Sequence, residues 1–396
     1  MSHPSMRLSR RSALLGLTTA FTLGRASLAL ANAATEQRFV VVILRGALDG
    51  MAAVVPYGDS ALTELRGSLL LPEPGRDGGL LDLGGFYGLH PAMPAMHQMY
   101  TQGQMLPVHA VAGPYRVRSH FEAQDYLEYG SNHALTSGWL NRAATLLPAT
   151  RGGTETALAV GTSIPLLLRG QAPVGSWLPK TNGRPEPELY SRMLAIHQKD
   201  PITGPAVANG LKERGFTEAT LSTPEAGNRY AFPALCASAG KLLAAADGPR
   251  LAALEIGGWD THAAQKNRIG GTLKQLDDGM ASLKAGLGDA WPKTVVMIMT
   301  EFGRTVRVNG TGGTDHGTGA AAFVLGGKIA GGKVLANWPG LATHNLFENR
   351  DLQPTLDLRS LAKGLLASQF NLDARAQSTV FPDSAHASAV PGLLRV

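Results

Sequence analysis

Short apolar runs, rich in β-branched residues, recur along the chain, and each is followed by a glycine-rich or polar turn. Because these runs are continuous rather than alternating in polarity, they predict strands that are buried on both faces of a sheet. The predicted strands are Phe39–Leu44, Met105–Val111, Ala157–Val160, Leu251–Ile256, Val295–Met299 and Ala321–Leu325.

Apolar residues at helical spacing lie between most of these strands. They predict helices over Pro91–Gln102, His120–Tyr129, Ser137–Leu147, Asn267–Leu287 and Thr355–Leu372. Strands that alternate with helices predict an α/β fold with a mostly parallel central sheet and helices on both faces.

One stretch departs from this alternation. Gly175–Thr223 carries proline, asparagine, glycine and charged residues with weak periodicity, and we expect an insertion or cap there rather than part of the sheet. The remaining pattern is continuous, so we expect a single domain over residues 34–396.

The first 33 residues have the three parts of a secretory signal peptide. Adjacent Arg10 and Arg11 precede the apolar, acid-free run Ala13–Leu30, and small residues spaced by one follow in Ala29–Ala33. The arginine pair indicates the twin-arginine route, in which the translocon carries a folded protein to the periplasm or beyond. A retained membrane anchor is the alternative, but Arg25 and several threonines interrupt the run. We therefore expect cleavage and no stable anchor.

Charge and cysteine content change the picture only slightly. Removing the signal takes away four arginines and no acid, so the formal charge falls from +6 to +2 (6 minus 4). No polybasic run with interleaved aromatic residues remains, which argues against nucleic-acid binding. The single cysteine, Cys236, makes an intramolecular disulfide impossible.

The candidate chemistry lies directly after the predicted strands. The polar residues found there are Arg45, Asp49, Arg118, Ser119, His120, Asp260, His262, Glu301, Arg304, Asp315 and His316. In open α/β sheets, ligands bind at the carboxyl ends of the strands, so we expect these side chains to converge on one site. Carboxylates and imidazoles suit a divalent metal such as zinc, manganese or calcium.

Several of these residues have an alternative interpretation. Asp260 and His262 form the best ligand pair, because one intervening residue lets both project toward one point. Asp49 precedes a glycine and could simply form a turn. Ser119 precedes a predicted helix, and Glu122 three residues later would complete a capping box.

The remaining alternatives concern the other candidates. His120 could pack rather than act in the site, and Asp315 with His316 lies between glycines, where a turn is expected. Glu301 could form a buried pair with Arg304 or Arg45 instead of binding a metal, in which case those arginines would not bind substrate.

The same segments carry a family resemblance. The motifs are Gly46-x-x-Asp49-Gly50, Leu89-His90-Pro91, Ser119-His120-Phe121-x-x-x-Asp125, Gly258-Trp259-Asp260-Thr261-His262, Thr300-Glu301-Phe302-Gly303-Arg304 and Asp315-His316-Gly317. Together with the twin-arginine start, they resemble the exported family known as domain of unknown function 1501. The resemblance runs from about Phe39 to about Leu372. It implies the alkaline phosphatase and sulfatase superfamily, with a central mixed sheet and a site at the strand ends.

That superfamily typically holds two metals around a hydroxyl or modified cysteine nucleophile. By position, Asp49 resembles the ligand from the first strand and Ser119 resembles the nucleophile. Asp260, His262 and the late His316 resemble the ligands of one metal. Glu301 resembles the carboxylate of the second, where the superfamily often has an Asp-His pair.

These observations predict a metal-dependent hydrolase of phosphate or sulfate esters, with a small anionic ester or a polysaccharide as substrate. Ser119 and His120 are the expected catalytic residues, and three arginines, Arg45, Arg118 and Arg304, the expected substrate-binding ones. The expected metal ligands are Asp49, Asp260, His262, Glu301, Asp315 and His316. The alternative is a non-catalytic exported binding or assembly protein on the same scaffold.

Overall fold

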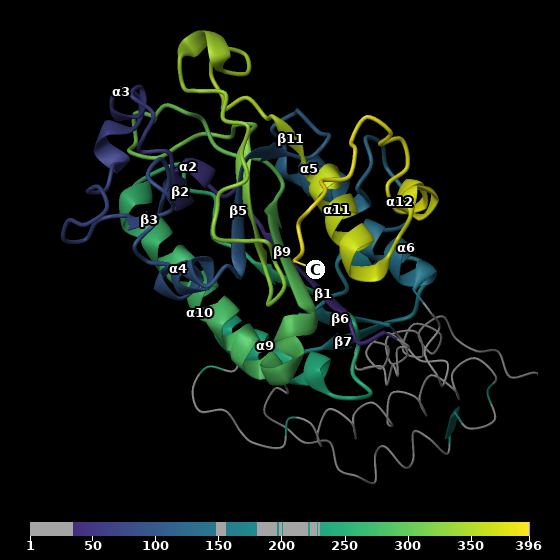
Figure 1. Cartoon of the computed structure of the whole chain (residues 1–396). Coiled ribbons are helices and arrows are strands. Elements are labelled where there is room, and N and C mark those ends of the chain that lie inside the picture. The colour runs from purple at the N-terminus through teal and green to yellow at the C-terminus, as the bar shows by residue number, and fades with distance from the viewer. Residues whose placement is uncertain are drawn as a thin grey trace, which may run out of the picture.

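The apolar runs of the sequence form the strands of a central sheet. In the computed structural model, which describes residues 35–147, 156–179, 196–197, 200, 221, 228 and 230–395, eight strands pair in the order β11-β5-β10-β9-β1-β8-β6-β7 (Figure 1). Their bounds are β1 (Arg38–Leu44), β5 (Met105–Ala112), β6 (Ala157–Val160), β7 (Val174–Trp177), β8 (Leu251–Ile256), β9 (Thr294–Thr300), β10 (Ala320–Leu325) and β11 (Leu356–Asp357).

The direction of the strands confirms the predicted mostly parallel sheet. All printed pairings of these strands are parallel except those of β10, which runs antiparallel to both β5 and β9. The strand β1 is buried along its whole length, as its continuous apolar sequence predicts. A separate small sheet joins β2 (Val54–Val55), β4 (Gly88–Leu89) and β3 (Leu81–Asp82) in antiparallel pairs.

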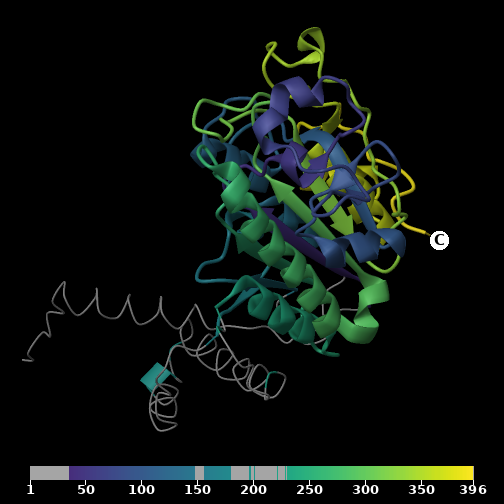
Figure 2. The same cartoon turned by 90° about the vertical axis from the view of Figure 1, so that its left-hand side faces the viewer.

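Helices cover both faces of the central sheet. Their bounds are α2 (Gly50–Ala53), α3 (Leu62–Arg66), α4 (Pro94–Thr101), α5 (His120–Tyr129), α6 (Trp139–Leu146), α9 (Phe232–Ala244), α10 (Gln265–Leu287), α11 (Leu358–Phe370) and α12 (Ala374–Val380). Short 3-10 turns lie at Gly67–Leu69, Leu166–Leu168, Gly288–Lys293 and Thr343–Asn345. The helices α4, α9 and α10 lie on one side of the sheet, and α5, α6, α11 and α12 lie on the other (Figures 1 and 2).

Alternate residues of β1 divide between two apolar cores. Val40, Val42 and Leu44 belong to the core shared with α4, α9 and α10. Phe39 and Ile43 belong to the core shared with α6 and α11. This period of two places successive side chains on opposite faces of the sheet, so both faces must be covered.

The apolar pattern of the sequence did not predict the helix α9. It lies against α10, and the approach is so close that a Cβ on Gly240 would sit 2.6 Å from the Leu283 carbonyl oxygen. A Cβ on Gly286 would likewise sit 2.4 Å from the Ala237 carbonyl oxygen. Small residues allow this packing, but they also weaken the apolar periodicity by which a helix is recognised.

The stretch expected to be an insertion begins inside the sheet. The strand β7 spans Val174–Trp177 and pairs in parallel with β6, so residues 175–177 are sheet rather than cap. Because β7 is an edge strand, it pairs with a neighbouring strand on one side only. A short sequence of mixed polarity is therefore sufficient to form it. Apart from a few residues, the rest of Gly175–Thr223 lies outside the described residues, as does the expected signal peptide. Within the described ranges, no helix combines the length and apolar character that crossing a bilayer requires.

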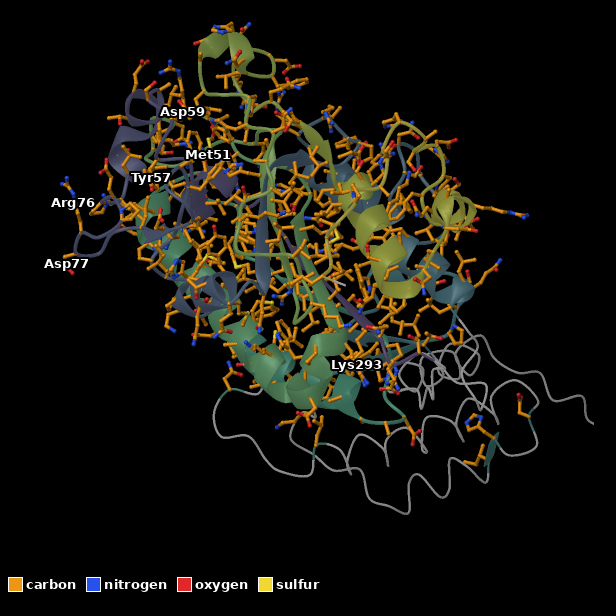
Figure 3. All side chains as sticks on the ribbon, in the orientation of Figure 1. Met51, Tyr57, Asp59, Arg76, Asp77 and Lys293 are labelled. Atoms are coloured by element: carbon orange, nitrogen blue, oxygen red, sulfur yellow. The ribbon has the colours of Figure 1, made fainter. Side chains whose placement is uncertain are left out.

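The parallel arrangement brings the carboxyl ends of β1, β5, β8 and β9 together. The line of these strand ends is called this edge of the sheet below, and it is distinct from the edge strands β7 and β11. Met51 follows β1 at this edge, and Lys293 precedes β9 at the opposite edge (Figure 3). The strand β10 is reversed, so the residues that precede it also lie at the edge marked by Met51. The loops at this edge carry every residue that the sequence predicts for the site.

Candidate metal centre

Three imidazole nitrogens and one carboxylate oxygen converge at this edge. His316 Nε2 lies 2.9 Å from His120 Nε2 and 3.0 Å from His262 Nε2. Asp260 Oδ1 lies 3.0 Å from His262 Nε2, 3.4 Å from His316 Nε2 and 3.6 Å from His120 Nε2. These four atoms, from His120, Asp260, His262 and His316, are called the four-donor group below.

Each member of the four-donor group comes from a loop set by the sheet. His120 is the first residue of α5, which follows β5. Asp260 and His262 lie in the loop after β8, and His316 lies just before β10. The group therefore collects side chains from three segments that are far apart in the sequence.

The ring nitrogen that faces away from the group is held by an acceptor in every histidine. His120 Nδ1 lies 2.8 Å from Glu301 Oε1, and His262 Nδ1 lies 3.1 Å from Asp315 Oδ1. His316 Nδ1 lies 3.0 Å from the backbone carbonyl oxygen of Arg118. Carboxylates and carbonyls only accept hydrogen bonds, so in each neutral imidazole the proton sits on Nδ1. Each Nε2 is then left with a lone pair that points into the group.

The chemistry of this donor set fits a divalent cation. A proton on one Nε2 could satisfy only one of the close contacts, whereas a cation could meet several of these atoms at once. The donor atoms of His120, Asp260 and His316 all lie within 4.8 Å of one another. His262 Nε2 lies 3.0 Å from two of them, His316 Nε2 and Asp260 Oδ1. Histidine nitrogen and carboxylate oxygen are ligands of zinc, and related transition cations such as manganese accept the same atoms. Calcium prefers six to eight oxygen ligands, so three nitrogens do not suit it. Partners on Nδ1, as here, are the usual means of orienting ligating imidazoles.

Two of the histidines have pKa values shifted in opposite directions. The hydrogen bond that His120 donates to Glu301, together with the charge of that carboxylate, raises the pKa of His120. Burial lowers the pKa of His316, which keeps that imidazole neutral. A neutral His316 between two neighbouring donors is the state that a metal ligand requires.

Arg304 holds the loops of the group together. This buried guanidinium donates to the carbonyl oxygens of Ala47 at 2.9 Å and Thr314 at 2.9 Å. It also donates to those of Gly46 at 3.0 Å and Trp259 at 3.2 Å, and to Asp260 Oδ1. Burial alone would raise the pKa of Asp260, but Arg304 more than offsets this and the pKa is lowered.

Gly46 allows the loop after β1 to approach the loop after β8. Its φ is +117°, a conformation that side-chain-bearing residues rarely adopt, and a Cβ there would lie 2.9 Å from the Asp260 amide nitrogen. The Gly46 amide also donates to Glu301 Oε1 at 2.8 Å.

Glu301 is a positioning residue for His120. Besides His120 Nδ1 and Gly46 N, it accepts hydrogen bonds from Gln124 Nε2 at 3.1 Å and Thr300 Oγ1 at 2.9 Å. Burial raises the pKa of this carboxyl group, but the hydrogen bonds from His120 and its other donors outweigh burial and lower it. The carboxylate is ionised and saturated with donors, and the structure places it behind His120 rather than in the four-donor group.

Asp315 has the same relation to His262. Its Oδ1 also accepts from Asn309 Nδ2 at 3.0 Å, and that bond, followed by the bond from His262, lowers the pKa of the carboxyl group.

Asp49 lies in a different, fully buried network. Its carboxylate pairs with the guanidinium of Arg66, accepts from Gln265 Nε2 at 2.5 Å, and accepts from the Met51 amide at 3.2 Å. As the residue before α2, it caps that helix. The structure does not bring Asp49 into the four-donor group, because its oxygens are already occupied by these donors.

The arginines predicted to bind substrate are all paired with carboxylates. Arg45 contacts Glu128 at 2.7 Å and also contacts Glu255. Arg118 contacts Asp351 at 2.8 Å and also contacts Glu348. With Arg304 on Asp260, all three arginines are engaged in ion pairs. The pair of Glu301 with Arg304 or Arg45 that the sequence left open does not form, because Glu301 contacts His120 instead.

Ser119 occupies the N-cap position of α5, but its side chain does not cap the helix. Glu122 accepts a hydrogen bond from the Tyr115 hydroxyl, so the predicted capping box is not formed. Within the described part of the chain, the Ser119 hydroxyl has no hydrogen-bond partner. The serine lies between Arg118, whose carbonyl oxygen orients His316, and His120.

Four supporting residues, Phe302, Gln124, Gln265 and Arg66, were not assigned a role from the sequence. The Phe302 ring lies under two imidazoles, with centroids 4.9 Å from His120 and 5.1 Å from His316. Gln265 accepts from Thr261 Oγ1 at 2.9 Å and Thr314 Oγ1 at 2.6 Å, which joins both ligand loops to Asp49. Gln124, Gln265 and Arg66 gave no signal in the sequence, because their roles depend on partners in other loops.

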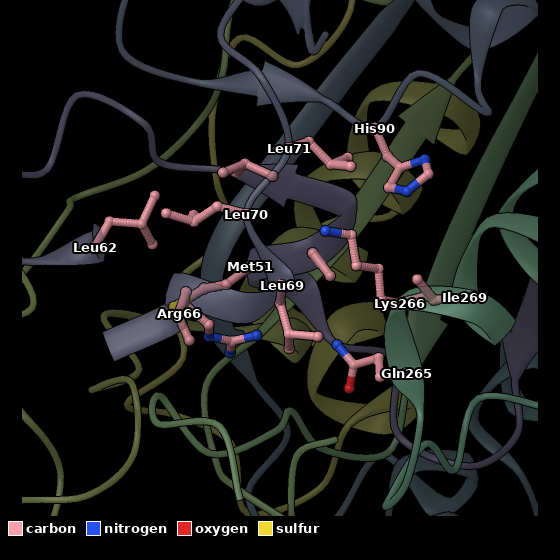
Figure 4. A pocket seen from close by; sticks show the side chains of 12 residues that line it. Met51, Leu62, Arg66, Leu69, Leu70, Leu71, His90, Gln265, Lys266 and Ile269 are labelled. Atoms are coloured by element: carbon pink, nitrogen blue, oxygen red, sulfur yellow. The ribbon is translucent and has the colours of Figure 1, made fainter. Parts of the chain in front are cut away.

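A hollow lies on the other side of this supporting network. It is lined mainly by apolar side chains, among them Met51, Leu62, Leu70 and Ile269 (Figure 4). Of its polar members, Arg66 and Gln265 already bind Asp49, and the others are His90 and Lys266. None of the four donors lines this hollow, so it is separate from the four-donor group.

Comparison with known proteins gives one family and a set of distant folds. Residues 90–381 match the model of the family described as protein of unknown function (DUF1501). No curated protein matches the chain.

Three solved structures illustrate the fold matches. One is Ps i-CgsB in complex with k-i-k-neocarrahexaose, at 11% identity and a TM-score of 0.41, over 90% of this chain and 77% of that chain. Another is the C-terminal periplasmic domain of EcEptC from Escherichia coli in complex with Zn, at 11% identity and a TM-score of 0.31, over 76% of this chain and 75% of that chain. The third is a protein in the alkaline phosphatase superfamily from Vibrio parahaemolyticus, at 11% identity and a TM-score of 0.33, over 83% of this chain and 71% of that chain.

Proposed function

The chain belongs to the family of proteins of unknown function DUF1501, whose name leaves the activity open, and we propose that it is an exported, metal-dependent hydrolase of phosphate or sulfate esters. The observation that carries the proposal is the four-donor group. The donor atoms of His120, Asp260 and His316 lie within 4.8 Å of one another, and His262 Nε2 lies beside the last two. An acceptor on Nδ1 fixes the orientation of each imidazole.

His120, Asp260, His262 and His316 would hold the cation. A bound zinc or manganese ion would neutralise negative charge that develops on the oxygens of the ester. Glu301, Asp315 and the Arg118 carbonyl oxygen keep each Nδ1 protonated, so each Nε2 stays available. Arg304 holds the Asp260 carboxylate in place and lowers its pKa, so it stays ionised.

Ser119 is the proposed nucleophile, because its hydroxyl is unengaged and it is flanked by residues that build the centre. In the first step the Ser119 oxygen bonds to phosphorus or sulfur, the bond to the ester oxygen breaks, and the serine proton leaves on the alcohol. Water then cleaves the Ser119 ester, which releases the free acid and restores the hydroxyl. The free amides of the first turn of α5 would face the negative oxygens during both steps.

The expected twin-arginine signal gives the proposal its location. A protein that folds before export can acquire its metal in the cytoplasm and carry it across the membrane. Sequencing the N-terminus of protein recovered from the periplasm would test this part, and cleavage near Ala31 or Ala33 is the expected result.

Elemental analysis tests the metal centre. Purified mature protein should contain close to one zinc or manganese per chain, and His316→Ala should lose it. Asp278→Asn is the matched control, because Asp278 is an exposed acid on α10 that pairs only with Lys274 in the described structure. A well-folded wild-type sample that takes up no metal would overturn the proposal and favour the exported binding protein.

The variant Ser119→Ala tests the chemistry separately. It should keep its fold and its metal, because the serine makes no capping bond, and it should lose turnover of aryl phosphate or sulfate esters. Undiminished turnover in this variant would rule out the serine as nucleophile.

A further inference from the structure

The charges around the four-donor group limit what kind of ester it can accept. Asp260, Glu301 and Asp315 bring three carboxylates and Arg304 brings one guanidinium, a formal charge of minus two. A divalent cation cancels that charge but leaves no excess.

The other charged side chains of these loops add no net positive charge. Arg116 donates to the backbone carbonyl oxygens of Gly113 and Tyr115, and Glu122 in the first turn of α5 balances its charge. Arg118 and Arg350 both contact Asp351, and Arg118 also contacts Glu348, so two cations face two anions. Arg45 is outnumbered by its partners Glu128 and Glu255. A substrate with two negative charges would therefore find its second charge unmatched.

Exposed apolar residues flank Ser119 in the sequence. Phe121 follows His120 and is 89% exposed, and Val117 is 64% exposed. Phe121 is the most exposed of the large hydrophobic side chains in the described residues. By contrast, Phe302, whose ring centroid lies 4.9 Å from that of His120, is buried. Because Ser119 and His120 lie between Val117 and Phe121 in the chain, these two exposed side chains are available to an apolar group of a bound substrate.

We propose that the substrate is an ester with a single negative charge and an aryl or alkyl group, and that Phe121 and Val117 contact that group. This inference rests on the proposed function and narrows it to one substrate class. Phosphate diesters and sulfate monoesters share this chemistry, and phosphate monoesters, which carry two charges near neutral pH, do not.

Binding to the inert, zinc-loaded Ser119→Ala variant tests the class without turnover. Calorimetry should find that diphenyl phosphate, with one charge, binds at least about tenfold more tightly than phenyl phosphate, with two. Adding Phe121→Ala should weaken diphenyl phosphate about tenfold and leave dimethyl phosphate unchanged, because only the phenyl group reaches that side chain. Phe121→Leu should restore most of the affinity.

Leu146→Ala is the matched control, since Leu146 is an exposed hydrophobic residue on α6, a helix that contributes no residue to the four-donor group. It should leave the affinity for both phosphates unchanged. Equal or tighter binding of phenyl phosphate, or no effect of Phe121→Ala, would overturn the inferred substrate class.

Turnover then separates this inference from the proposed function. All three test esters release the same leaving group, 4-nitrophenol. Wild-type protein should cleave phenyl 4-nitrophenyl phosphate or 4-nitrophenyl sulfate with a higher kcat/KM than 4-nitrophenyl phosphate. Whichever of the first two is cleaved faster shows whether the substrate is a phosphate diester or a sulfate ester. If 4-nitrophenyl phosphate is cleaved fastest, the protein is a hydrolase but the inferred preference for esters with a single charge is wrong. If diphenyl phosphate is bound selectively but none of the three esters is cleaved, the binding preference stands and the hydrolase falls.

Discussion

Two carboxylates follow neighbouring strands at the same edge of the sheet, and each is paired with a buried arginine. Asp49, after β1, is 1% exposed, and Arg66, Gln265 and the Met51 amide occupy its oxygens. Asp260, after β8, has a side chain that is 47% exposed, and beyond Arg304 its Oδ1 faces three imidazole nitrogens with lone pairs. The two carboxylates differ in how many hydrogen-bond donors surround them. Donors occupy the oxygens of Asp49, so this residue stabilises the fold. Around Asp260, the imidazole lone pairs have no donor, and this leaves a site for a cation.

The largest effect should come from breaking the saturated pair. Asp49→Ala should lower the free energy of unfolding by about 3–5 kcal/mol, because it leaves the buried Arg66 charge without its partner. Urea titration measures this, with the exposed Asp278→Ala as control. Molecules that remain folded should keep their zinc, and a folded Asp49→Ala protein without zinc would instead identify Asp49 as a ligand.

His109 sharpens the same comparison, because both of its ring nitrogens are already satisfied. Nε2 lies 2.9 Å from the Val54 carbonyl oxygen, and Nδ1 accepts from the Ala110 amide at 2.9 Å. Burial lowers the pKa of His109 to about 4. The unfolded chain takes up this proton near pH 6.5, so the stabilising contribution is complete above that pH and is lost as the pH falls toward 4.

The expected loss amounts to about 3 kcal/mol over that interval. Unfolding free energies of wild type and His109→Gln, measured from pH 7 to pH 4, should diverge in slope, with the variant flatter. His90, whose pKa burial also lowers to about 4, contributes equally to both proteins. Identical slopes would contradict the assignment to His109.

Removing a member of the four-donor group should affect metal binding far more than stability. His262→Ala should weaken zinc binding by more than about 100-fold, as judged by competition with a chelator of known affinity. The metal-free variant should unfold within about 0.5 kcal/mol of the metal-free wild type, because the side chain is 44% exposed. A large loss of stability without a change in zinc affinity would reverse the roles assigned to the two regions.

The smallest effect is expected for a residue behind a donor. Asp315→Ala removes the acceptor of His262 Nδ1 and should weaken zinc binding by about 10- to 100-fold. Asp315→Asn keeps an acceptor oxygen and should lose less. If both variants bind zinc as wild type does, Asp315 has no part in orienting His262.

The sequence was sufficient to predict which loops meet. Continuous apolar runs such as Phe39–Leu44 and Leu251–Ile256 place their strands within a residue of the observed ends, and parallel pairing then brings their carboxyl ends to one edge. The family motifs lie in those same loops. The edge of the sheet, the α/β class and the family were therefore within reach of sequence reasoning.

The sequence does not predict which charged side chains pair with one another at these strand ends. Whether Asp49 or Asp260 is saturated depends on Arg66 and Gln265, which approach from other segments. Likewise, the partners of Arg45 and Arg118 include Glu255 and Asp351, more than 200 residues away in the chain. Several charges compete for a few partners at close range, and spacing along the sequence does not determine the outcome.

The four-donor group also has a mechanical consequence. It gathers His120 and His316, which are 196 positions apart, together with the segment of Asp260 and His262. A chain with one cysteine cannot fasten such distant segments by a disulfide, but a bound cation would cross-link them and hold the start of α5 to the sheet. The metal would then be a reversible cross-link. A chelator that removes it would destabilise the attachment of α5 to the sheet and abolish the proposed activity together.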